Sequence, residues 1–300
     1  MSRHDCAGAT LPELLVGLVI SLLVVMTAVA GTVRYQRASA TVEVWMNARG
    51  QLRDAADILA ADLRGISVPG DSLLATADTA VEFRSALGSS FVCSIPSANR
   101  IVLPPDSLPA ERVLSSWVMP PDSGDMLLTY VAAGDSSPGQ WARRRINAFV
   151  PIRASLGCPQ AAGMLDVAEI AGAGSAYDVT LDGPILEVQR GAPVRILRRV
   201  RYSVYRGGDG HWYVGYRRCT TGCAATQPIS GPYDVPRGYP LSLRYFDRSG
   251  ATLSINGPTT NPASVEVTVR TAYQRPLWFP GMAVRTDDST RSLIALRNAR

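Results

Sequence analysis

Gly8-Ala9-Thr10-Leu11-Pro12-Glu13-Leu14-Leu15 opens the stretch that decides the fold, and an apolar run from Leu14 to Val33 continues it. That run has 20 residues and no charged side chain. A helix rises about 1.5 Å per residue, so a run of this length crosses the roughly 30 Å hydrocarbon core of a membrane. Glu13 lies directly against the run, where a carboxylate needs a partner because its charge is costly in lipid. The stretch therefore predicts a membrane-crossing helix with one charge at its entrance.

The helical pattern continues beyond the apolar run. Residues that share one helix face recur at spacings of three and four, and all but Arg49 are apolar: Val42, Trp45, Arg49, Leu52, Ala56, Leu59 and Leu63. Gly65 and Pro69 are typical of a helix end. We therefore expect one helix from Leu11 to Arg64, about 80 Å long at 1.5 Å per residue. Its first half suits lipid, and its second half offers an apolar stripe to a sheet.

The junction and the helix together resemble a known signal. Small residues at Gly8 and Ala9, a glutamate five residues after Gly8, and a long apolar helix resemble the class III signal of type IV prepilins and pseudopilins. The resemblance implies that prepilin peptidase cuts after Gly8 and methylates the new amino terminus at Ala9. It also implies that Glu13 pairs with the terminal amine of a neighbouring subunit when the helices stack into a filament. Such pairing makes physical sense, since a buried carboxylate and a buried amine are each costly alone.

Two other interpretations of the amino terminus stay open. Ala28-Val29-Ala30 matches the cleavage site of an ordinary secretory signal peptide, although the apolar run exceeds the usual length of about 7–15 residues. The second alternative is a plain signal anchor. Arg34 and Arg37 follow the run, and by the positive-inside rule they argue against outward export of the carboxy-terminal part.

From about residue 66 the sequence changes to short β-type runs between turn clusters. We expect strands at 81–84, 91–93, 100–103, 126–131, 164–170, 177–181, 185–189 and 265–270. Alternating residues also predict a hairpin that joins 194–204 to 212–216 through 207–210, and a second hairpin that joins 241–247 to 251–255.

The expected fold is therefore α+β, with a long amino-terminal transmembrane and amphipathic helix packed on an antiparallel, β-rich globular domain. The expected division is a leader at 1–8, a transmembrane segment at 9–33, an amphipathic continuation at 34–65 and a periplasmic β-rich domain at 66–300.

The order of the carboxy-terminal motifs adds to the resemblance. An arginine-rich strand with a glycine-rich turn, then Leu243-Arg244-Tyr245-Phe246-Asp247, then Val265-Glu266-Val267-Thr268-Val269-Arg270 are similar to PilW-type minor pilins and to J-type pseudopilins of type II secretion. This implies a structural subunit that takes part in initiation or tip assembly of a filament. The implied partners are prepilin peptidase, other minor and major pilins, and the inner-membrane assembly platform. The implied location is the inner membrane with the carboxy-terminal domain in the periplasm, and then the pilus or pseudopilus.

The cysteines beyond the leader are even in number, whereas Cys6 lies within the leader. An even number in an exported domain predicts two disulfides, and four cysteines allow three pairings. We favour Cys219 with Cys223, which closes a short turn, and Cys93 with Cys158, which closes a long loop. The alternative is a metal site built on the two later cysteines and His211, but no second C-x-x-C motif accompanies it.

The sequence offers no recognisable catalytic motif. It has no Walker loop, no G-x-S-x-G and no H-E-x-x-H. Of its two histidines His4 lies in the leader, so a histidine-based triad would rest on His211 alone. Asp122 and Asp125 lie in a Pro/Ser/Gly-rich loop, where turn formation accounts for them. A calcium site in this loop is the alternative, but no D-x-D-x-D-G spacing accompanies it. We therefore expect no enzymatic activity, no cofactor and no metal site.

The basic residues form the other candidate site. The chain has a net charge of +5, and all 30 of its basic residues are arginine. A basic patch is expected where arginines and aromatic residues share one sheet face near the glycine-rich turn: Arg195, Arg199, Arg201, Arg217 and Arg218, with Arg143-Arg144-Arg145, Arg198 and Arg206 as further members, beside Trp212, Tyr213 and Tyr216. Cations beside aromatic rings suit single-stranded nucleic acid or a phosphate-rich surface. The alternative is that outward strand positions need polar residues and this chain draws them from arginine.

A second hypothesis for the function follows from this patch. The protein would be a signal-anchored periplasmic module that binds DNA or another component of the envelope. It differs from the pilin hypothesis in two ways: its amino terminus would remain uncut, and an unrelated anchor could replace its helix.

Overall fold

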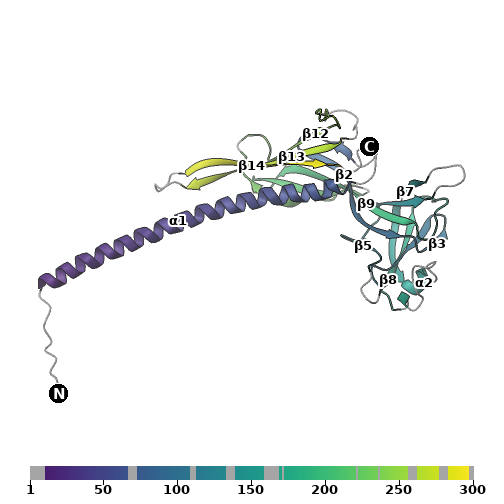
Figure 1. Cartoon of the computed structure of the whole chain (residues 1–300), viewed down its shortest axis with the longest axis horizontal. Coiled ribbons are helices and arrows are strands. Elements are labelled where there is room, and N and C mark those ends of the chain that lie inside the picture. Colours follow the sequence, from purple (N-terminus) through teal and green to yellow (C-terminus); the bar gives the residue numbers. More distant parts are fainter. Residues whose placement is uncertain are drawn as a thin grey trace, which may run out of the picture.

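The structure is a computed structural model that describes residues 11–66, 73–108, 113–132, 139–158, 169–170, 172–220, 222–235, 237–255, 262–276 and 283–296. One long helix, α1 (Leu11–Arg64), projects from a head of antiparallel strands (Figure 1). This is the α+β fold expected from the sequence. The expected cleavage and methylation positions Gly8 and Ala9, and also Cys6, lie outside the described residues.

Helix α1 has the bounds that the periodicity predicts. It closes at Gly65, whose N–H lies 3.2 Å from the carbonyl oxygen of Ala61 and 3.1 Å from that of Asp62. The buried residues all lie in its second half: Ala48, Leu52, Ala55, Ala56, Leu59, Ala60 and Leu63. Val42 and Trp45, which the stripe includes, are 52% and 39% exposed. The head therefore covers the helix only from Ala48 onward, one to two turns later than the stripe predicts.

The other elements follow α1 in chain order. They are β1 (Leu73–Thr76), β2 (Ala80–Phe91), β3 (Ser94–Ser97), β4 (Arg100–Leu103), β5 (Ser116–Trp117), β6 (Met126–Val131), β7 (Gln140–Arg153), α2 (Ala154–Gly157), β8 (Ser175–Leu181), β9 (Pro193–Arg206), β10 (Trp212–Arg218), β11 (Gln227–Tyr233), β12 (Leu241–Phe246), β13 (Ser264–Pro276) and β14 (Ala283–Ala295).

Strand β9 is a central strand of the larger sheet and has partners on both edges. One of its edges pairs with β2 along residues 193–203. Its other edge is shared, because β6 pairs with residues 194–197 and β10 pairs with residues 200–206. Beyond β6 the sheet continues through β7, β8, β4 and β3, and beyond β10 it ends at β11. A separate three-stranded sheet has the order β12-β13-β14, and its last two strands form a long hairpin beside α1 (Figure 1).

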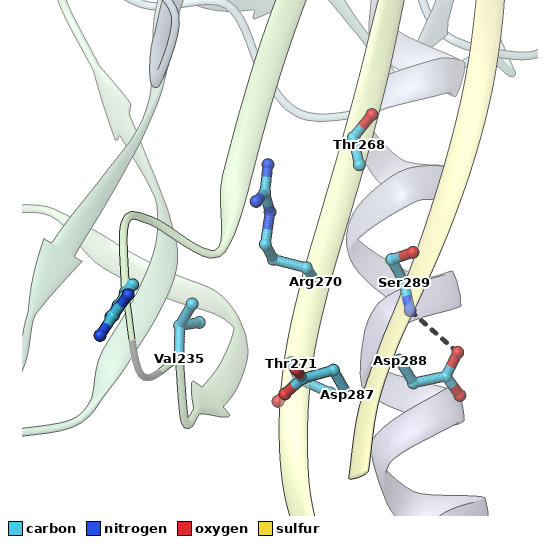
Figure 2. Close-up of a pocket in the computed structure, with 8 residues that line it drawn as sticks. Val235, Thr268, Arg270, Thr271, Asp287, Asp288 and Ser289 are labelled. Carbon is cyan, nitrogen blue, oxygen red and sulfur yellow. Dashed lines mark hydrogen bonds between the residues drawn. The ribbon is translucent and has the colours of Figure 1, made fainter.

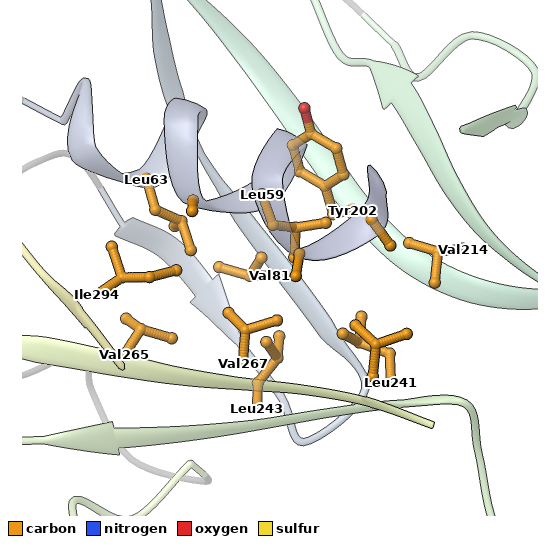
Figure 3. Packing of buried hydrophobic residues seen from close by; sticks show 14 of the residues in the cluster. Leu59, Leu63, Val81, Tyr202, Val214, Leu241, Leu243, Val265, Val267 and Ile294 are labelled. Carbon is orange, nitrogen blue, oxygen red and sulfur yellow. The ribbon is translucent and has the colours of Figure 1, made fainter. Parts of the chain in front are cut away.

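This arrangement creates two main hydrophobic cores. The first lies where α1 meets both sheets, and Figure 3 shows Leu59 and Leu63 of the helix facing Val265 and Val267 of β13. The second core is formed by the far ends of β2 and β9 with β4, β6, β7 and β8, and includes Ile146. A smaller cluster packs around α2 and the first disulfide. The long strands β2 and β9 contribute to both main cores and so hold the two parts of the head together.

The strand predictions are confirmed in part. The segments 81–84, 100–103, 126–131, 177–181 and 265–270 are strands, and β9 and β10 form the expected hairpin. Gly210 adopts a φ of 83° in its turn, a left-handed conformation that glycine tolerates. Two predictions are wrong, because 185–189 is a turn region and Glu169–Ile170 is helical; residues 164–168 lie outside the described chain. Within 91–93 only Phe91 belongs to a strand.

The second predicted hairpin is confirmed in part. The chain turns after Phe246, and residues 251–253 return beside β12 with a bridge from Thr252 to Phe246 and two backbone hydrogen bonds, Asp247 N–H to the Ala251 carbonyl oxygen at 3.0 Å and Leu253 N–H to the Tyr245 carbonyl oxygen at 2.8 Å. The return is too short to form a strand. Strand β12 pairs along its whole length with β13, and its residues Leu241, Leu243 and Tyr245 lie in the core against α1.

Candidate functional site

The first functional feature is the part of α1 that extends beyond the head. By length and composition α1 is a helix able to cross a membrane, and none of its most apolar window is buried. Large apolar side chains are exposed on all sides of it, among them Leu14, Leu18 and Met26 at 65%, 67% and 60%. Glu13 lies in its first turn. A helix that is apolar all round requires an apolar surrounding, so it can serve as a membrane anchor or a signal.

The apolar exposure does not end with the uncharged run. Between the run and the head, Val42, Val44, Trp45 and Met46 remain 39–61% exposed. These residues lie after Arg34 and Arg37, on a length of helix that extends beyond a 20-residue span. Exposed apolar side chains that lie close together are typical of a surface that contacts another protein or a membrane.

The second half of α1 is fixed to the head by polar contacts as well as by the core. The Tyr202 hydroxyl donates to Asp62 at 2.6 Å, and the Ser230 hydroxyl donates to the Gln51 carbonyl oxygen at 2.7 Å. An ion pair of 3.1 Å joins Arg49 Nε to Asp288 of β14. Because these contacts reach three strands of the head, they attach the helix to the head from residue 49 onward.

A pocket of about 470 Å³ lies beside this attachment, lined by Val235, Arg237, Thr268, Arg270, Thr271, Asp287, Asp288 and Ser289. Figure 2 shows Thr268 and Arg270 on β13 next to Ser289 on β14, with the Ser289 N–H donating to the Asp288 carboxylate at 2.8 Å. Two arginines and two aspartates line it, and Asp288 is paired with Arg49. Asp287 is therefore the lining carboxylate that remains opposite Arg237 and Arg270, and the lining has a small excess of positive charge.

The basic residues gather on the sheet face that points away from α1. Residues directly opposite each other in neighbouring strands share a face, and side chains alternate along each strand. The printed registers place seven arginines together, which we call the arginine face: Arg84, Arg143, Arg145, Arg195, Arg199, Arg201 and Arg217. They come from β2, β7, β9 and β10. Six of the ten arginines predicted as a patch belong to this face, and Arg84 is the member that the sequence analysis missed.

Arg218 is one of four predicted members that the structure excludes; the others are Arg144, Arg198 and Arg206. Arg218 lies opposite Val200, on the face that packs toward α1, and its guanidinium pairs with Asp122 at 3.4 Å. Trp212 and Tyr216 also lie on that face, whereas Tyr213 lies on the arginine face. Arg218 and the two aromatic residues lie off the arginine face because side chains alternate along a strand, so that residues adjacent in sequence point to opposite faces.

Arg198 is the excluded member whose side chain lies in the interior of the head. Its side chain is 1% exposed and its Nη2 lies 2.6 Å from Asp125, which is fully buried. Burial lowers the pKa of Arg198, but the hydrogen bonds and charge of Asp125 raise that pKa to a value above the ordinary one. Asp125 is therefore the partner of a buried cation, and turn formation alone does not account for it.

Aromatic pairs lie at both ends of the arginine face. At one end Trp141 and Tyr130 contact edge to face with ring centroids 5.7 Å apart, and the Arg195 guanidinium lies 5.3 Å from the Trp141 ring. At the other end Tyr205 and Tyr213 stack with centroids 5.6 Å apart. The sequence analysis did not predict strand β7, which contributes Trp141 and two arginines to the arginine face. The run Arg143-Arg144-Arg145 shows that this segment is basic, but it lacks the alternation of polar and apolar residues that indicates a strand.

Negative charge on the face is sparse. Among the described strand positions Glu82 is the carboxylate on the face; it is 5% exposed and contacts Arg199 and, at 3.5 Å, Arg201. Asp182 and Asp209 lie at the two ends, beside Arg145 and Tyr213 respectively. In the described part of the chain the Arg217 Nε is buried without an acceptor. Arg84, Arg143 and Arg195 each have a further interaction, so these three arginines of the face are not free of partners.

Both disulfides join the cysteines that the sequence analysis pairs. Cys93 bonds Cys158 across 65 residues, and Cys219 bonds Cys223 across 4. The first connects the end of β2 to α2, and the second closes the turn after β10. Among the described residues no group of three histidines, cysteines or acidic residues could hold a metal ion. The expected absence of catalysis stays a prediction.

Comparison with protein-family models, with curated proteins and with solved structures finds no match to this chain.

Proposed function

We propose that this protein is a minor pilin, a structural subunit that prepilin peptidase processes and that takes part in the initiation or tip assembly of a type IV pilus. The alternative is a J-type minor pseudopilin of type II secretion, which would be processed and assembled in the same way; the two are variants of one proposal. The proposal combines the Gly8-Ala9 junction and Glu13 in the sequence with the shape of α1.

The observation that carries the proposal is the surplus length of exposed apolar helix. From Leu11 to Asn47, α1 extends about 55 Å at 1.5 Å per residue before the head covers it. A single membrane crossing needs only about 20 residues. Val42, Trp45 and Met46 lie past that length and remain exposed. A simple anchor has no use for apolar side chains there, whereas a bundle of stacked subunit helices would cover them.

The rigid attachment of α1 to the head supports the same proposal. Leu52, Leu59 and Leu63 are fully buried, and the Tyr202–Asp62 hydrogen bond adds a polar link. Force or displacement applied to the helix is then transmitted to the head without a flexible joint. This property suits a subunit that positions its neighbours, and a tethered binding module does not require it.

The proposal places the protein in the inner membrane before assembly, with the head in the periplasm. Its partners are then prepilin peptidase, other minor and major pilins, and the inner-membrane assembly platform. The two disulfides fit this location, since the periplasm is oxidising. No catalytic role is proposed.

The first test is the intact mass and amino-terminal sequence of protein purified from its native membrane. We expect a chain that begins at Ala9, with or without one methyl group. A Gly8→Arg variant, which destroys the small-residue junction, should retain the leader. A chain that begins at Gly31 would be a secreted protein released by an ordinary signal peptidase. One that begins at Met1 or Ser2 would be an anchored module. Either result overturns the proposal.

A further inference from the structure

We propose that a pocket at the far end of the head binds a quaternary ammonium group, with three aromatic rings and the Asp106 carboxylate supplying the attraction. The pocket has a volume of about 420 Å³ and is lined by residues of β5, β7 and β8, among others. Figure 1 shows these strands at the end of the head away from the free part of α1. A ligand bound there leaves the exposed stretch of α1 free, so the inference goes beyond the proposed function and does not depend on it.

Three aromatic rings from three strands line the pocket together. Phe149 and Tyr177 stack with ring centroids 4.7 Å apart and an interplanar angle of 23°. The Trp117 ring stands almost perpendicular to that of Phe149, at an interplanar angle of 88° with centroids 6.2 Å apart. The rings therefore form an aromatic corner, and the negative face of such a ring attracts a cation that lies within about 6 Å of its centroid.

Asp106 connects two of these rings and adds a negative charge. Its Oδ1 accepts the Trp117 Nε1–H at 2.8 Å, and its Oδ2 accepts the Tyr177 hydroxyl at 2.8 Å. Its carbonyl oxygen accepts the Leu114 N–H at 2.8 Å, which fixes the backbone at this point. Burial, with the hydrogen bond and charge of Asp106, raises the pKa of Tyr177 to about 12. Tyr177 therefore stays a neutral donor at physiological pH, and the carboxylate keeps the charge.

The charge of the pocket favours a cation. Among the lining residues that the structure describes, Asp106 has the charged side chain and none is an arginine. Arg198 contacts two of the lining residues, Met119 and Pro120. Its charge is balanced by the Asp125 carboxylate, 2.6 Å away. The described lining therefore carries a single negative charge, which attracts a cation.

The apolar part of the lining favours a methylated cation over a primary ammonium group. Val113, Val118 and Met119 are all exposed at the pocket. A primary ammonium group that leaves water needs several hydrogen-bond acceptors, and the lining is poor in them. A quaternary ammonium group donates no hydrogen bond, and its methyl groups pack against aromatic rings, as in the aromatic cages that bind choline and methylated lysine.

The polar part of the lining does not suit a neutral sugar. A sugar needs several polar groups that fix its orientation. In the described lining the polar side chains besides Asp106 and the aromatic residues are those of Ser107, Ser115 and Ser116. The Ser115 hydroxyl is already hydrogen-bonded to the Ser90 hydroxyl at 2.7 Å. The pocket therefore offers a sugar few directional contacts.

The experiment compares two ligands of the same shape that differ in charge. One is choline, and the other is its neutral carbon isostere, in which a tert-butyl group replaces the trimethylammonium group. Isothermal titration calorimetry of the full-length protein in a non-ionic detergent gives both affinities. We expect a Kd for choline of about 1 mM or below, and an affinity for the isostere at least about tenfold weaker. No measurable choline binding, or equal affinity for the two ligands, would overturn the proposal.

Variants test the rings and the carboxylate separately. Trp117→Leu should weaken choline binding at least about fivefold, because it removes a cation–π contact. Trp141→Leu is the matched control: Trp141 lies on β7 outside the described lining, so the Kd should be unchanged. Asp106→Asn should weaken binding of choline but not of the isostere. Equal effects of the two tryptophan variants would contradict the assignment. Circular dichroism establishes that each variant is folded, and the comparison of ligands in the wild-type protein needs no variant.

A third ligand distinguishes two sources of the quaternary ammonium group. Glycerophosphocholine carries the same group next to a phosphate, as in a lipid headgroup. If the pocket takes a headgroup, glycerophosphocholine should bind at least as tightly as choline. If it takes a free cation, the phosphate is repelled by the Asp106 carboxylate and should weaken binding. Either result supports a quaternary ammonium site, provided that the neutral isostere binds more weakly than choline.

Discussion

Arg198 and Asp125 form an ion pair that is almost completely removed from water, with side-chain exposures of 1% and 0%. Arg198 Nε lies 2.8 Å and Nη2 2.6 Å from the two carboxylate oxygens, and Nη2 also donates to the Pro120 carbonyl oxygen at 3.1 Å. The Asp122 N–H completes the carboxylate's contacts at 2.8 Å. The pair therefore joins β9 to the loop before β6 at the boundary between the two main cores.

Breaking this pair should destabilise the head strongly. We expect Asp125→Ala to lower the free energy of unfolding by about 3–5 kcal/mol, because it leaves a buried guanidinium without its counter-charge. The double variant Arg198→Met with Asp125→Leu should recover most of that loss, since apolar replacement of both partners removes the desolvation cost. Urea denaturation followed by tryptophan fluorescence measures both. Arg218→Ala is the surface control; its 3.4 Å pair with Asp122 is roughly half exposed, so the loss should be under about 1 kcal/mol.

The Tyr202–Asp62 hydrogen bond predicts alkaline sensitivity of the helix attachment. Burial, with the charge and hydrogen bond of Asp62, raises the pKa of the Tyr202 phenol above its usual value of about 10. Burial likewise raises the pKa of Tyr233 to about 12. A folded-state pKa above the unfolded one gives stability that is fully present below about pH 10 and is lost as pH rises beyond it. We therefore expect the free energy of unfolding to fall between about pH 10 and 12.

Tyr202→Phe tests this assignment. It should cost about 1.5–3 kcal/mol at neutral pH, as expected for a hydrogen bond to a charged group, and should reduce the alkaline fall in stability. The control is Tyr239→Phe at a tyrosine that is 47% exposed. Denaturation curves collected across the pH range give both quantities. A wild-type protein whose stability is constant from pH 8 to about pH 12 would contradict the burial argument.

The two disulfides should contribute unequally to stability. Loop-closure entropy predicts about 4 kcal/mol for Cys93–Cys158, whose partners are 65 residues apart, and about 2 kcal/mol for Cys219–Cys223, whose partners are 4 apart. Replacing each pair by alanine and measuring the free energy of unfolding gives the two losses. Equal losses would mean that local packing, and not the restriction of the unfolded chain, determines their effect.

The sequence predicts some elements better than others, and the reason is whether local pattern and tertiary burial agree. In α1 they agree, because apolar periodicity and the Gly65 terminator mark its end. In β9 and β10, strict alternation and a glycine turn specify the hairpin. Strand β14 carries Arg285-Thr286-Asp287-Asp288-Ser289-Thr290, a polar run with weak strand propensity, and it is a strand because β13 pairs with it along its whole length. Such a pairing between segments cannot be derived from local pattern.

The arginine face, like the fold, could be predicted from the sequence only in part. The composition locates an arginine-rich region, but only the register between strands decides which arginines share a face. Arg143 and Arg145 join Arg195 because β6 lies between β7 and β9. Arg198 and Arg218 leave the group for the same geometric reason. Strand order depends on long-range contacts, which one sequence without an alignment does not reveal.

The exposed stretch of α1 before the head should matter for assembly of the filament and not for the stability of the head. Leu59→Ala should lower the free energy of unfolding by about 2–5 kcal/mol, because Leu59 is fully buried against β13. Trp45→Ser should lower the stability of the head by no more than about 1 kcal/mol, because Trp45 lies outside the core and its ring contacts the Arg49 guanidinium, 4.6 Å from the ring centroid. It should nevertheless reduce chemical cross-linking between helices of neighbouring subunits in the native membrane. Unchanged cross-linking would show that no partner covers this stretch.

Glu13 predicts a defect confined to assembly. Under the proposed function, Glu13→Gln removes the charge that aligns neighbouring subunits but leaves the Gly8-Ala9 junction intact. We therefore expect normal leader removal by amino-terminal sequencing, normal accumulation in the membrane, and a severe loss of surface filaments or of secretion. Glu43→Gln is the matched control, since Glu43 is an exposed glutamate on the same helix beyond the apolar run. If the Glu13 variant assembles as well as the Glu43 variant, pairing of this carboxylate with a neighbouring amine is not part of assembly.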